Sequence, residues 1–434
     1  MTDSKIATIK ARELLDSKGR PMVEVDVLTS SGAFGRGSAP CGTSVGKHEA
    51  FVLRDGGKRF DGLGVKKAVM NVTDVIAPVL LGKNIFDQRA IDERMIELDG
   101  TPNKSLLGAN TIYSVSVAVA RAAAANAGLP LYRHLAGESL GYLPVPAFNV
   151  INGGPYSDTA VEFQEFLILP TSADTYAEAL RMGVEVFYEV GRTLEKRYGR
   201  NHVRSGHYGG YAAPVDDPFQ IIECLLEAVN DAGYGGKFQV GLDCAASHFY
   251  DEKRKIYQLR KKQLTRTDMI AFLESLTKSF PIFFIEDPLE EDDFDGFEEI
   301  TARLGTLIVG DDLFVTNIER LKQGIAKGAA DAVLFKPNQI GTLTEAIDTA
   351  KFATAHGYHV IPSSRGGGTV DDPITDISAA ICASFAKFGA PRTGERTNYQ
   401  NRMLRMEEDL GKSVRLFDLG KIGKNKKHIF KAKR

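Results

Sequence analysis

The second half of the chain repeats one pattern, in which a short apolar run leads directly into polar residues and a helical segment follows. The apolar runs stand in KFQVGLDCA, PIFFIEDP, TLIVGDD, AVLFKPNQ and YHVIPSSR. Segments between them, such as TDMIAFLESLTKSF and GTLTEAIDTAKFATAHG, have the apolar spacing of helices. The pattern therefore predicts successive parallel strands joined by helices.

A polar residue closes each of these predicted strands. The five residues are Asp243, Glu286, Asp311, Lys336 and Arg365. A βα repeat takes about 30 residues, which is close to most of the intervals between them. In a closed barrel such strand ends meet on one face, where active sites are built. A doubly wound open sheet is the alternative, but it gives no reason for five consecutive strand ends to be polar.

The first third of the chain orders its elements differently. MVEVDVLT alternates as a strand does, and GAFGRGSAP predicts a turn-rich second strand. VKKAVMNVTDVIAPVL and GANTIYSVSVAVARAAAANAG then predict helices. This order indicates a small α+β domain. Prolines and glycines around residues 135–145 mark a boundary, so we place the α+β domain at 1–138 and the barrel at 139–434.

Composition excludes several classes of protein. The chain has 434 residues, 43% apolar and 25% charged, which suits a globular protein with a substantial core. Its net charge of −2 gives no reason to expect nucleic acid or a membrane surface as a partner. The four cysteines match no zinc spacing, and no apolar run suits a signal peptide or a membrane helix. We expect a soluble cytoplasmic protein.

The three carboxylates among the strand-end residues suggest a site for a hard cation. Magnesium favours carboxylate oxygens and often shares the phosphate of a substrate. Calcium and manganese are alternatives, and the lack of clustered His and Cys argues against zinc. The competing interpretation is that each acid caps the helix that follows it.

The two cationic strand ends suggest acid–base and anion-binding roles. A metal and dehydrated surroundings would both lower the pKa of Lys336, making it a candidate general base. An ion pair with the carboxylates is the alternative. Arg365 precedes three glycines, a setting in which it could bind a phosphate or carboxylate beside exposed backbone N–H groups. A plain turn is the alternative there.

Several longer stretches resemble the enolase family across nearly the whole chain. They are ELLDSKGRPMVEVDV, LDGTPNKSLLGAN, LPVPAFNVINGG, QEFLILP, GLDCAAS, IEDPLEEDD, GDDLFVTN, LFKPNQIGTLTEAI and MLRMEEDLG. The resemblance implies an N-terminal capping domain on a modified (βα)8 barrel, and a homodimer or higher homo-oligomer.

The resemblance also implies roles for individual residues. Asp243, Glu286 and Asp311 are expected to hold the first Mg²⁺. Gly42 and Ser44, in the loop PCGTSVGKHEA, are expected to contact the substrate, with Ser44 also reaching a second Mg²⁺ that binds with it. Lys336 matches the base, Arg365 the phosphate-binding arginine and Glu165 an assisting glutamate. Glu24 and Arg405 match a pair at the dimer interface.

Other positions depart from the family pattern. The family has an Asp-Glu pair in a glycine-rich loop, with the Glu as general acid, where RSGHYGGYAAP has His207 and Tyr208. Tyr156 replaces a loop histidine. Ser364 and Gly366 replace the histidine and serine that flank the phosphate-binding arginine. Counting back from NRMLRMEEDLG, we expect Tyr399 to replace a second lysine that binds the substrate carboxylate.

These departures favour a changed reaction. Losing a positioned general acid costs about 10²–10⁴ in rate. We therefore expect a transferase that forms carboxyphosphonoenolpyruvate from a cytidine-nucleotide-activated phosphonoformate and an enolpyruvyl or phosphoglycerate acceptor, in phosphonate antibiotic biosynthesis of the phosphinothricin type. His207 and Tyr208 would be catalytic, and Tyr156, Ser364 and Tyr399 would bind the anionic substrates. The alternatives are a phosphopyruvate hydratase and a non-catalytic enolase-like binding protein.

Overall fold

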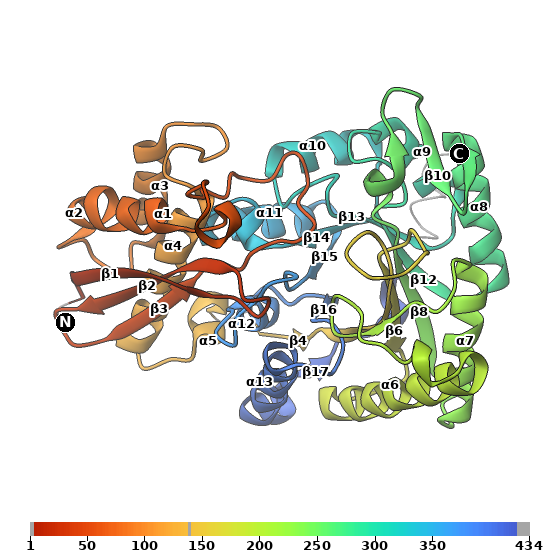
Figure 1. Cartoon of the computed structure of the whole chain (residues 1–434). Helices are drawn as coiled ribbons and strands as arrows, with labels where there is room; N and C mark the ends of the chain where they lie inside the picture. The colour runs from red at the N-terminus through yellow and green to blue at the C-terminus, as the bar shows by residue number, and fades with distance from the viewer. Residues whose placement is uncertain (1–3, 138–139, 423–434) are drawn as a thin grey trace.

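The computed structural model describes residues 4–137 and 140–422. An N-terminal α+β part lies beside a larger barrel part (Figure 1). One cluster of buried apolar side chains lies within the N-terminal part, and a larger one fills the barrel part and extends to α4 (Ala109–Asn126) and α5 (Leu131–Ala136) of the N-terminal part. The expected boundary at 138/139 falls on residues outside the described ranges and stays a prediction.

The N-terminal part is an antiparallel sheet covered by helices. The strands are β1 (Ile6–Leu15), β2 (Pro21–Thr29) and β3 (Phe34–Ser38), in that order. The helices are α1 (Lys66–Met70), the π-helical η2 (Asn71–Ile76), α2 (Ala77–Leu80), α3 (Gln88–Asp99), α4 (Ala109–Asn126) and α5 (Leu131–Ala136). Val23, Val25 and Val27 of β2 lie in the buried apolar cluster, as the alternation predicted, although the first five residues of the strand are all buried. Helix α4 packs against the sheet.

The barrel part is built on a nine-stranded sheet. Its strands are β5 (Val145–Asn152), β6 (Glu165–Pro170), β7 (Tyr211–Ala212), β8 (Phe238–Asp243), β12 (Ile282–Glu286), β13 (Leu307–Gly310), β14 (Ala332–Phe335), β15 (His359–Pro362) and β16 (Phe385–Lys387). The sheet closes because β16 pairs with β5, and because Ser363 at the end of β15 forms a bridge with Lys387. The expected capping domain on a modified (βα)8 barrel is confirmed.

The strands from β8 to β15 run parallel, as the repeat predicted, but β6 runs antiparallel to both of its neighbours. A loop without a helix joins β5 to β6, so the chain turns straight back. As a result β6 starts, rather than ends, at the face where the parallel strands end.

Helices surround the barrel (Figure 1). They are α6 (Tyr176–Tyr198), α7 (Pro218–Asp231), α8 (Arg266–Ser279), α9 (Phe294–Arg303), α10 (Ile318–Lys327), α11 (Leu343–Ala355), α12 (Ile374–Ala380) and α13 (Gly394–Leu410). Short strands β9 (Tyr250–Asp251), β10 (Ile256–Leu259) and β11 (Lys262–Leu264) form a small sheet, and β4 (Tyr142–Leu143) pairs with β17 (Arg415–Leu416). Within 4–137 and 140–422, no helix has the length and apolar character needed to cross a membrane.

Single-turn helices fill several loops: η1 (Arg59–Gly62), η3 (Arg200–His202), η4 (Ala246–Phe249), η5 (Pro337–Gln339) and η6 (Gly411–Ser413).

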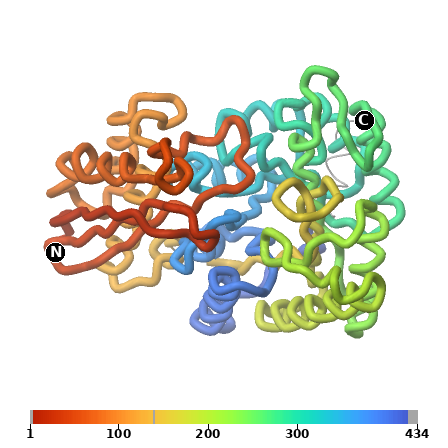
Figure 2. The backbone as a smooth tube through the Cα atoms, in the orientation of Figure 1, coloured from red at the N-terminus to blue at the C-terminus, as the bar shows by residue number. Residues whose placement is uncertain are grey.

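A segment of the N-terminal part reaches the barrel's strand ends (Figure 2). Cys41 and Gly367 exchange two backbone hydrogen bonds, of 2.8 and 3.0 Å. Ala50 donates its backbone N–H to Gln339 at 2.7 Å. Residues 41–50 are therefore fixed over the carboxyl ends of the strands.

Candidate active site

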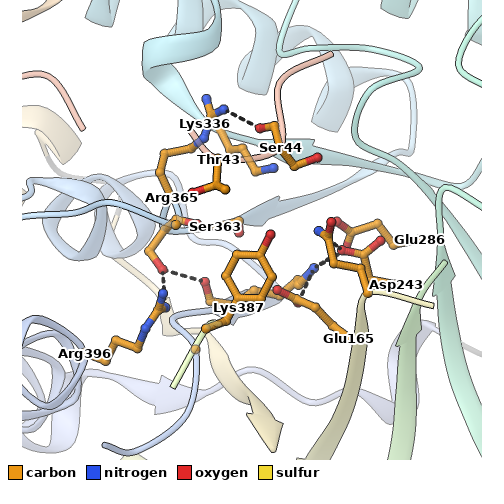
Figure 3. A pocket seen from close by; sticks show the side chains of 15 residues that line it. Thr43, Ser44, Glu165, Asp243, Glu286, Lys336, Ser363, Arg365, Lys387 and Arg396 are labelled. Carbon is orange, nitrogen blue, oxygen red and sulfur yellow. Dashed lines mark hydrogen bonds and ion pairs between the residues drawn. The ribbon is translucent and has the colours of Figure 1, made fainter. Parts of the chain in front are cut away.

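The strand ends and the N-terminal segment line a pocket of about 430 Å³, part of which is open to solvent (Figure 3). Its lining is almost wholly polar: Thr43, Ser44, Gln164, Glu165, Tyr208, Asp243, Glu286, Lys336, Ser363, Ser364, Arg365, Gly366, Lys387, Gly389 and Arg396. Of the five predicted strand-end residues, all but Asp311 line it directly.

Lys387, the last residue of β16, is at the centre of a carboxylate cluster. Its Nζ lies 3.0 Å from Glu165 Oε2 and 3.4 Å from Asp243 Oδ2, and it forms an ion pair with Glu286 (Figure 3). Asp243 and Glu286 end β8 and β12, and Glu165 begins β6. Three neighbouring strands, with β16 beyond β5, therefore bring four charged groups together from distant points of the sequence.

Burial and mutual charge shift these pKa values strongly. Burial raises the pKa of Glu286 well above its usual range, and the neighbouring Asp243 raises it further. Burial also raises the pKa of Glu165. Burial alone would lower the pKa of Lys387, but Glu165, Glu286 and Asp243 together raise it well above normal. Lys387 is therefore a firmly protonated cation.

Lys336 follows β14 and forms an ion pair with Asp311 Oδ2. Gln339 donates to the other oxygen of Asp311 at 3.0 Å. Burial acts to lower the pKa of Lys336, but Asp311 outweighs it and the pKa is raised. The adjacent buried carboxylate thus favours the ammonium form of Lys336, and the lowering of its pKa expected beside a metal stays a prediction.

Arg365 is held in place from the N-terminal part. Its two terminal nitrogens donate to the two carboxylate oxygens of Glu49, at 2.9 and 3.0 Å, and Nη2 also donates to Ser44 O at 3.1 Å. A Cβ at position 42 would lie 2.0 Å from Arg365 Nη2, so Gly42 leaves the space that the guanidinium occupies. Gly42 thus contacts Arg365 rather than lining the pocket.

The predicted carboxylate trio does not cap the following helices. The N-caps of α8, α9 and α10 are Thr265, Asp293 and Asn317. The capping interpretation of the strand-end acids therefore fails.

The charges of this cluster suit a divalent cation. Four buried carboxyl groups face two ammonium groups, so with all four ionised these six residues carry two uncompensated negative charges: Glu165, Asp243, Glu286, Asp311, Lys336 and Lys387. Unpaired buried charge is costly unless a cation neutralises it. The oxygen donors are of the type that Mg²⁺ prefers.

A tighter carboxylate group lies next to this cluster. Ligand atoms of Asp287, Asp311 and Asp312 all lie within 4.8 Å of one another. The two oxygens of Asp287, however, accept the backbone N–H groups of Asp311 and Asp312, each at 2.8 Å. Asp287 therefore shapes the turn after β13, and only Asp311 of this group belongs to the predicted trio.

Two tyrosines and two histidines lie together at one side of the pocket. Tyr208 lines it, and the His207 ring is 4.7 Å from the Tyr208 ring. Tyr156 lies outside the lining, 5.7 Å from His207 and 5.4 Å from His248 between ring centres. His248 Nε2 is 3.3 Å from the hydroxyl of Ser44. The family departures at 156, 207 and 208 are thus neighbours in space.

Tyr399 is not part of the pocket, which corrects the expectation for that position. It is only 1% exposed, and its hydroxyl donates to Thr369 O at 2.9 Å. A second lysine does line the pocket, and it is Lys387, which sequence reasoning missed. The alignment placed it inside α13, whereas the lysine lies in the strand FAK before that helix. The apolar–lysine–glycine order of FAKFG is the signal that could have found it.

Arg396 was also missed. It lines the pocket from α13, and its Nη1 donates to Ser364 Oγ at 3.3 Å. Ser364 and Gly366 do line the pocket, on either side of Arg365.

The fold and pocket define a class of α/β-barrel proteins with an N-terminal capping domain and a polar site at the carboxyl ends of the strands. Residues 6–135 match the family described as enolase, N-terminal domain, and residues 141–424 match enolase, C-terminal TIM barrel domain. An enolase of Methanopyrus kandleri is 49% identical over 410 residues, covering 94% of this chain and 96% of its own length. An enolase of Methanococcus aeolicus is 48% identical over 407 residues, with 94% and 96% covered. The chain belongs to the enolase family.

These relatives correct our functional expectation. They are named enolase, which indicates a lyase of the phosphopyruvate hydratase type and contradicts the expected transferase. The associated expectations, a cytidine nucleotide donor and a role in phosphonate antibiotic biosynthesis, lose their support with it. Near 50% identity over 94% of the chain outweighs an inference drawn from a few exchanged site residues.

Proposed function

We propose that the chain is a magnesium-dependent lyase that removes water from a 2-phospho-3-hydroxy acid, as in the conversion of 2-phosphoglycerate to phosphoenolpyruvate. The observation that carries the proposal is that Lys336, Lys387 and Arg365 line one pocket together with buried carboxylates. This set can bind an anion, stabilise a developing negative charge and remove a proton. The exchanged residues at 156, 207, 208, 364 and 366 make the chain an atypical member.

Each cationic group has a distinct part in this reaction. Arg365 binds the phosphate group, since its guanidinium is fixed by Glu49 and stays charged. Lys387 stabilises the negative charge that builds on the substrate's carboxylate when the α-proton leaves. Lys336 is the base, and it must first lose the proton that Asp311 helps it to retain.

Asp243, Glu286 and Asp311 would hold one Mg²⁺, and Ser44 would reach a second that arrives with the substrate. The ions supply positive charge that neutralises the carboxylate and phosphate of the substrate. A cation held by Asp311 would also offset the charge that raises the pKa of Lys336. Glu165 has no place in this ligand set, and it assists by compensating the charge of Lys387.

We further propose a homodimer with Glu24 and Arg405 at its interface. Glu24, on β2, lies in a charged group with Arg12 and Arg36, and Arg405 is on an exposed face of α13. A cytoplasmic location stays a prediction.

The test of the reaction is formation of phosphoenolpyruvate from 2-phosphoglycerate with Mg²⁺, followed by phosphorus NMR. We expect the natural chain to form the product and Lys336→Ala to lose at least about 10²-fold in rate. Lys278→Ala is the matched control, because that lysine is 72% exposed on α8 and pairs only with Glu274 among the described contacts. Equal rates in the Lys336 and Lys278 variants would rule out the base, and no product from any of them would leave a non-catalytic binding protein.

A further inference from the structure

The loop that carries His207 and Tyr208 is fixed by polar contacts along its backbone. Asn152 Oδ1 accepts the backbone N–H groups of Tyr208 and Gly210, at 3.0 and 3.1 Å. Arg392 donates to Gly209 O at 2.9 Å and to Gly210 O at 2.7 Å. Such contacts hold a side chain in one orientation before any substrate arrives.

His207 is held as well, and it limits how far Tyr208 can move. Lys18 donates to the backbone oxygen of His207, and His207 Nε2 lies 3.2 Å from Thr43 Oγ1. The His207 ring contacts the Tyr208 ring edge to face. Burial and the positive charge of Lys18 lower the pKa of His207 to about 4, so its ring is neutral near pH 7 and adds no charge beside Tyr208.

The Tyr208 hydroxyl has no hydrogen-bond partner among the described residues. The residue is 6% exposed and lines the pocket. Throughout 4–137 and 140–422 nothing forms a hydrogen bond with the hydroxyl. A buried hydroxyl without a partner is unfavourable, and this cost is recovered when a substrate group accepts its proton.

A second exchanged position makes room for this ring. A Cβ at position 366 would lie 3.3 Å from Tyr208 Cε1 and 2.6 Å from Thr43 Oγ1. A side chain at 366 would therefore crowd both groups. The serine-to-glycine and glutamate-to-tyrosine departures are thus linked in space, and Gly366 helps to accommodate the new side chain.

We propose that the Tyr208 hydroxyl delivers the proton with which the substrate's β-hydroxyl leaves as water. The inference rests on the proposed lyase reaction. Lys336 takes the α-proton, the electron pair of that C–H bond becomes the new C=C bond, and the β-carbon–oxygen bond breaks. The departing oxygen takes the proton of Tyr208. Lys336 then holds one extra proton and Tyr208 lacks one, and exchange with solvent restores both.

The hydroxyl is protonated when the reaction begins. Burial, Glu165 and Asp243 raise the pKa of Tyr208 well above that of an ordinary tyrosine, so the hydroxyl keeps its proton until the departing oxygen takes it. Lys387, which lines the same pocket, offsets part of this effect and stabilises the phenolate that forms.

The experiment separates the two proton steps by running the reaction in D₂O with 2-phosphoglycerate and Mg²⁺. Proton NMR follows exchange of the α-proton, which needs Lys336, and phosphorus NMR follows the elimination product. For Tyr208→Phe we expect exchange to continue while elimination falls about 10²–10⁴-fold. Tyr188→Phe, at an exposed position on α6, is the matched control and should change neither rate.

Unchanged elimination in Tyr208→Phe would overturn the proposal, and so would loss of both steps, because Tyr208 would then position or bind rather than donate. Tyr208→Glu supplies another acid at the same place and should eliminate at least about 10-fold faster than the Phe variant. A rate no higher than that of the Phe variant would count against proton donation. If the natural chain shows neither step, the lyase reaction itself fails, which is a different result from a failure of Tyr208.

Discussion

At the scale of one residue, Lys387 shows how neighbouring groups stabilise a buried charge. Its ammonium group compensates three carboxylates that come from β6, β8 and β12. Removing the cation would leave these carboxylates facing one another in a water-poor site, which is far more costly than losing one surface ion pair.

We therefore predict that Lys387→Met lowers the free energy of unfolding by about 3–5 kcal/mol in EDTA at pH 8. Urea unfolding measures this, with Lys278→Met as the exposed control. The pKa values of Glu286 and Glu165 are raised in the folded chain, so as pH falls the folded state takes up protons that the unfolded state has not yet bound. The loss of unfolding free energy caused by Lys387→Met should accordingly be smaller at pH 5 than at pH 8. An equal loss at both pH values would contradict this account.

At the residue scale the sequence predicted much of the site, but not its centre. Asp243, Glu286, Lys336 and Arg365 were found because each ends a predicted strand. Lys387 ends β16, a strand of only three residues, which is too short to show a periodic pattern. Tyr399 was predicted to bind substrate by counting back along the sequence from NRMLRMEEDLG. Counting does not determine which side of α13 faces the pocket.

At the scale of elements, β3 and α4 approach each other unusually closely. A Cβ at Gly37 would lie 2.2 Å from Ser114 O and 2.5 Å from Ala118 N, both backbone atoms of α4. Gly35 faces the same helix one turn further on, beside Ala118 and Ala122. Two glycines on the strand thus let the helix backbone rest directly on the sheet.

Gly37→Ala should lower the free energy of unfolding by about 1–3 kcal/mol, because the added methyl forces the helix away from the sheet. Thermal or urea unfolding measures the change. Gly305→Ala is the control, since a Cβ there meets no atom within 4 Å. Equal stability of the two variants would show that α4 moves without cost.

Helix and strand positions followed from apolar spacing, and the direction of β6 did not. Segments such as TDMIAFLESLTKSF and GTLTEAIDTAKFATAHG form α8 and α11 close to where they were predicted. An alternating or apolar run reads the same in either direction, so spacing cannot distinguish a parallel strand from an antiparallel one. Only the absence of a helix between β5 and β6 carries that information.

At the scale of the whole molecule, the site is shared between the two parts of the chain. Glu49 and Arg365, 316 residues apart, form a bidentate ion pair, and both side chains are only 3% exposed. Thr43 and Ser44, two hydroxyl-bearing residues of the N-terminal part, line the barrel's pocket. The capping domain and the barrel were predicted separately, but their contact could not be, because no local pattern records which loop reaches which strand end.

Because four barrel strands contribute its carboxylates, the site should couple Mg²⁺ binding to the stability of the whole fold. A ligand that binds only the folded chain stabilises it by about 2.7 kcal/mol at a concentration 100 times its Kd. We predict that Mg²⁺ raises the midpoint of thermal unfolding of the natural chain relative to EDTA, and that Glu286→Gln removes most of the rise. Glu223→Gln, at an exposed position on α7, should keep it. The readout needs no substrate, so it tests the cation site apart from the reaction. Equal midpoints in Mg²⁺ and EDTA would mean that Lys336 and Lys387 are the only positive charges these carboxylates require.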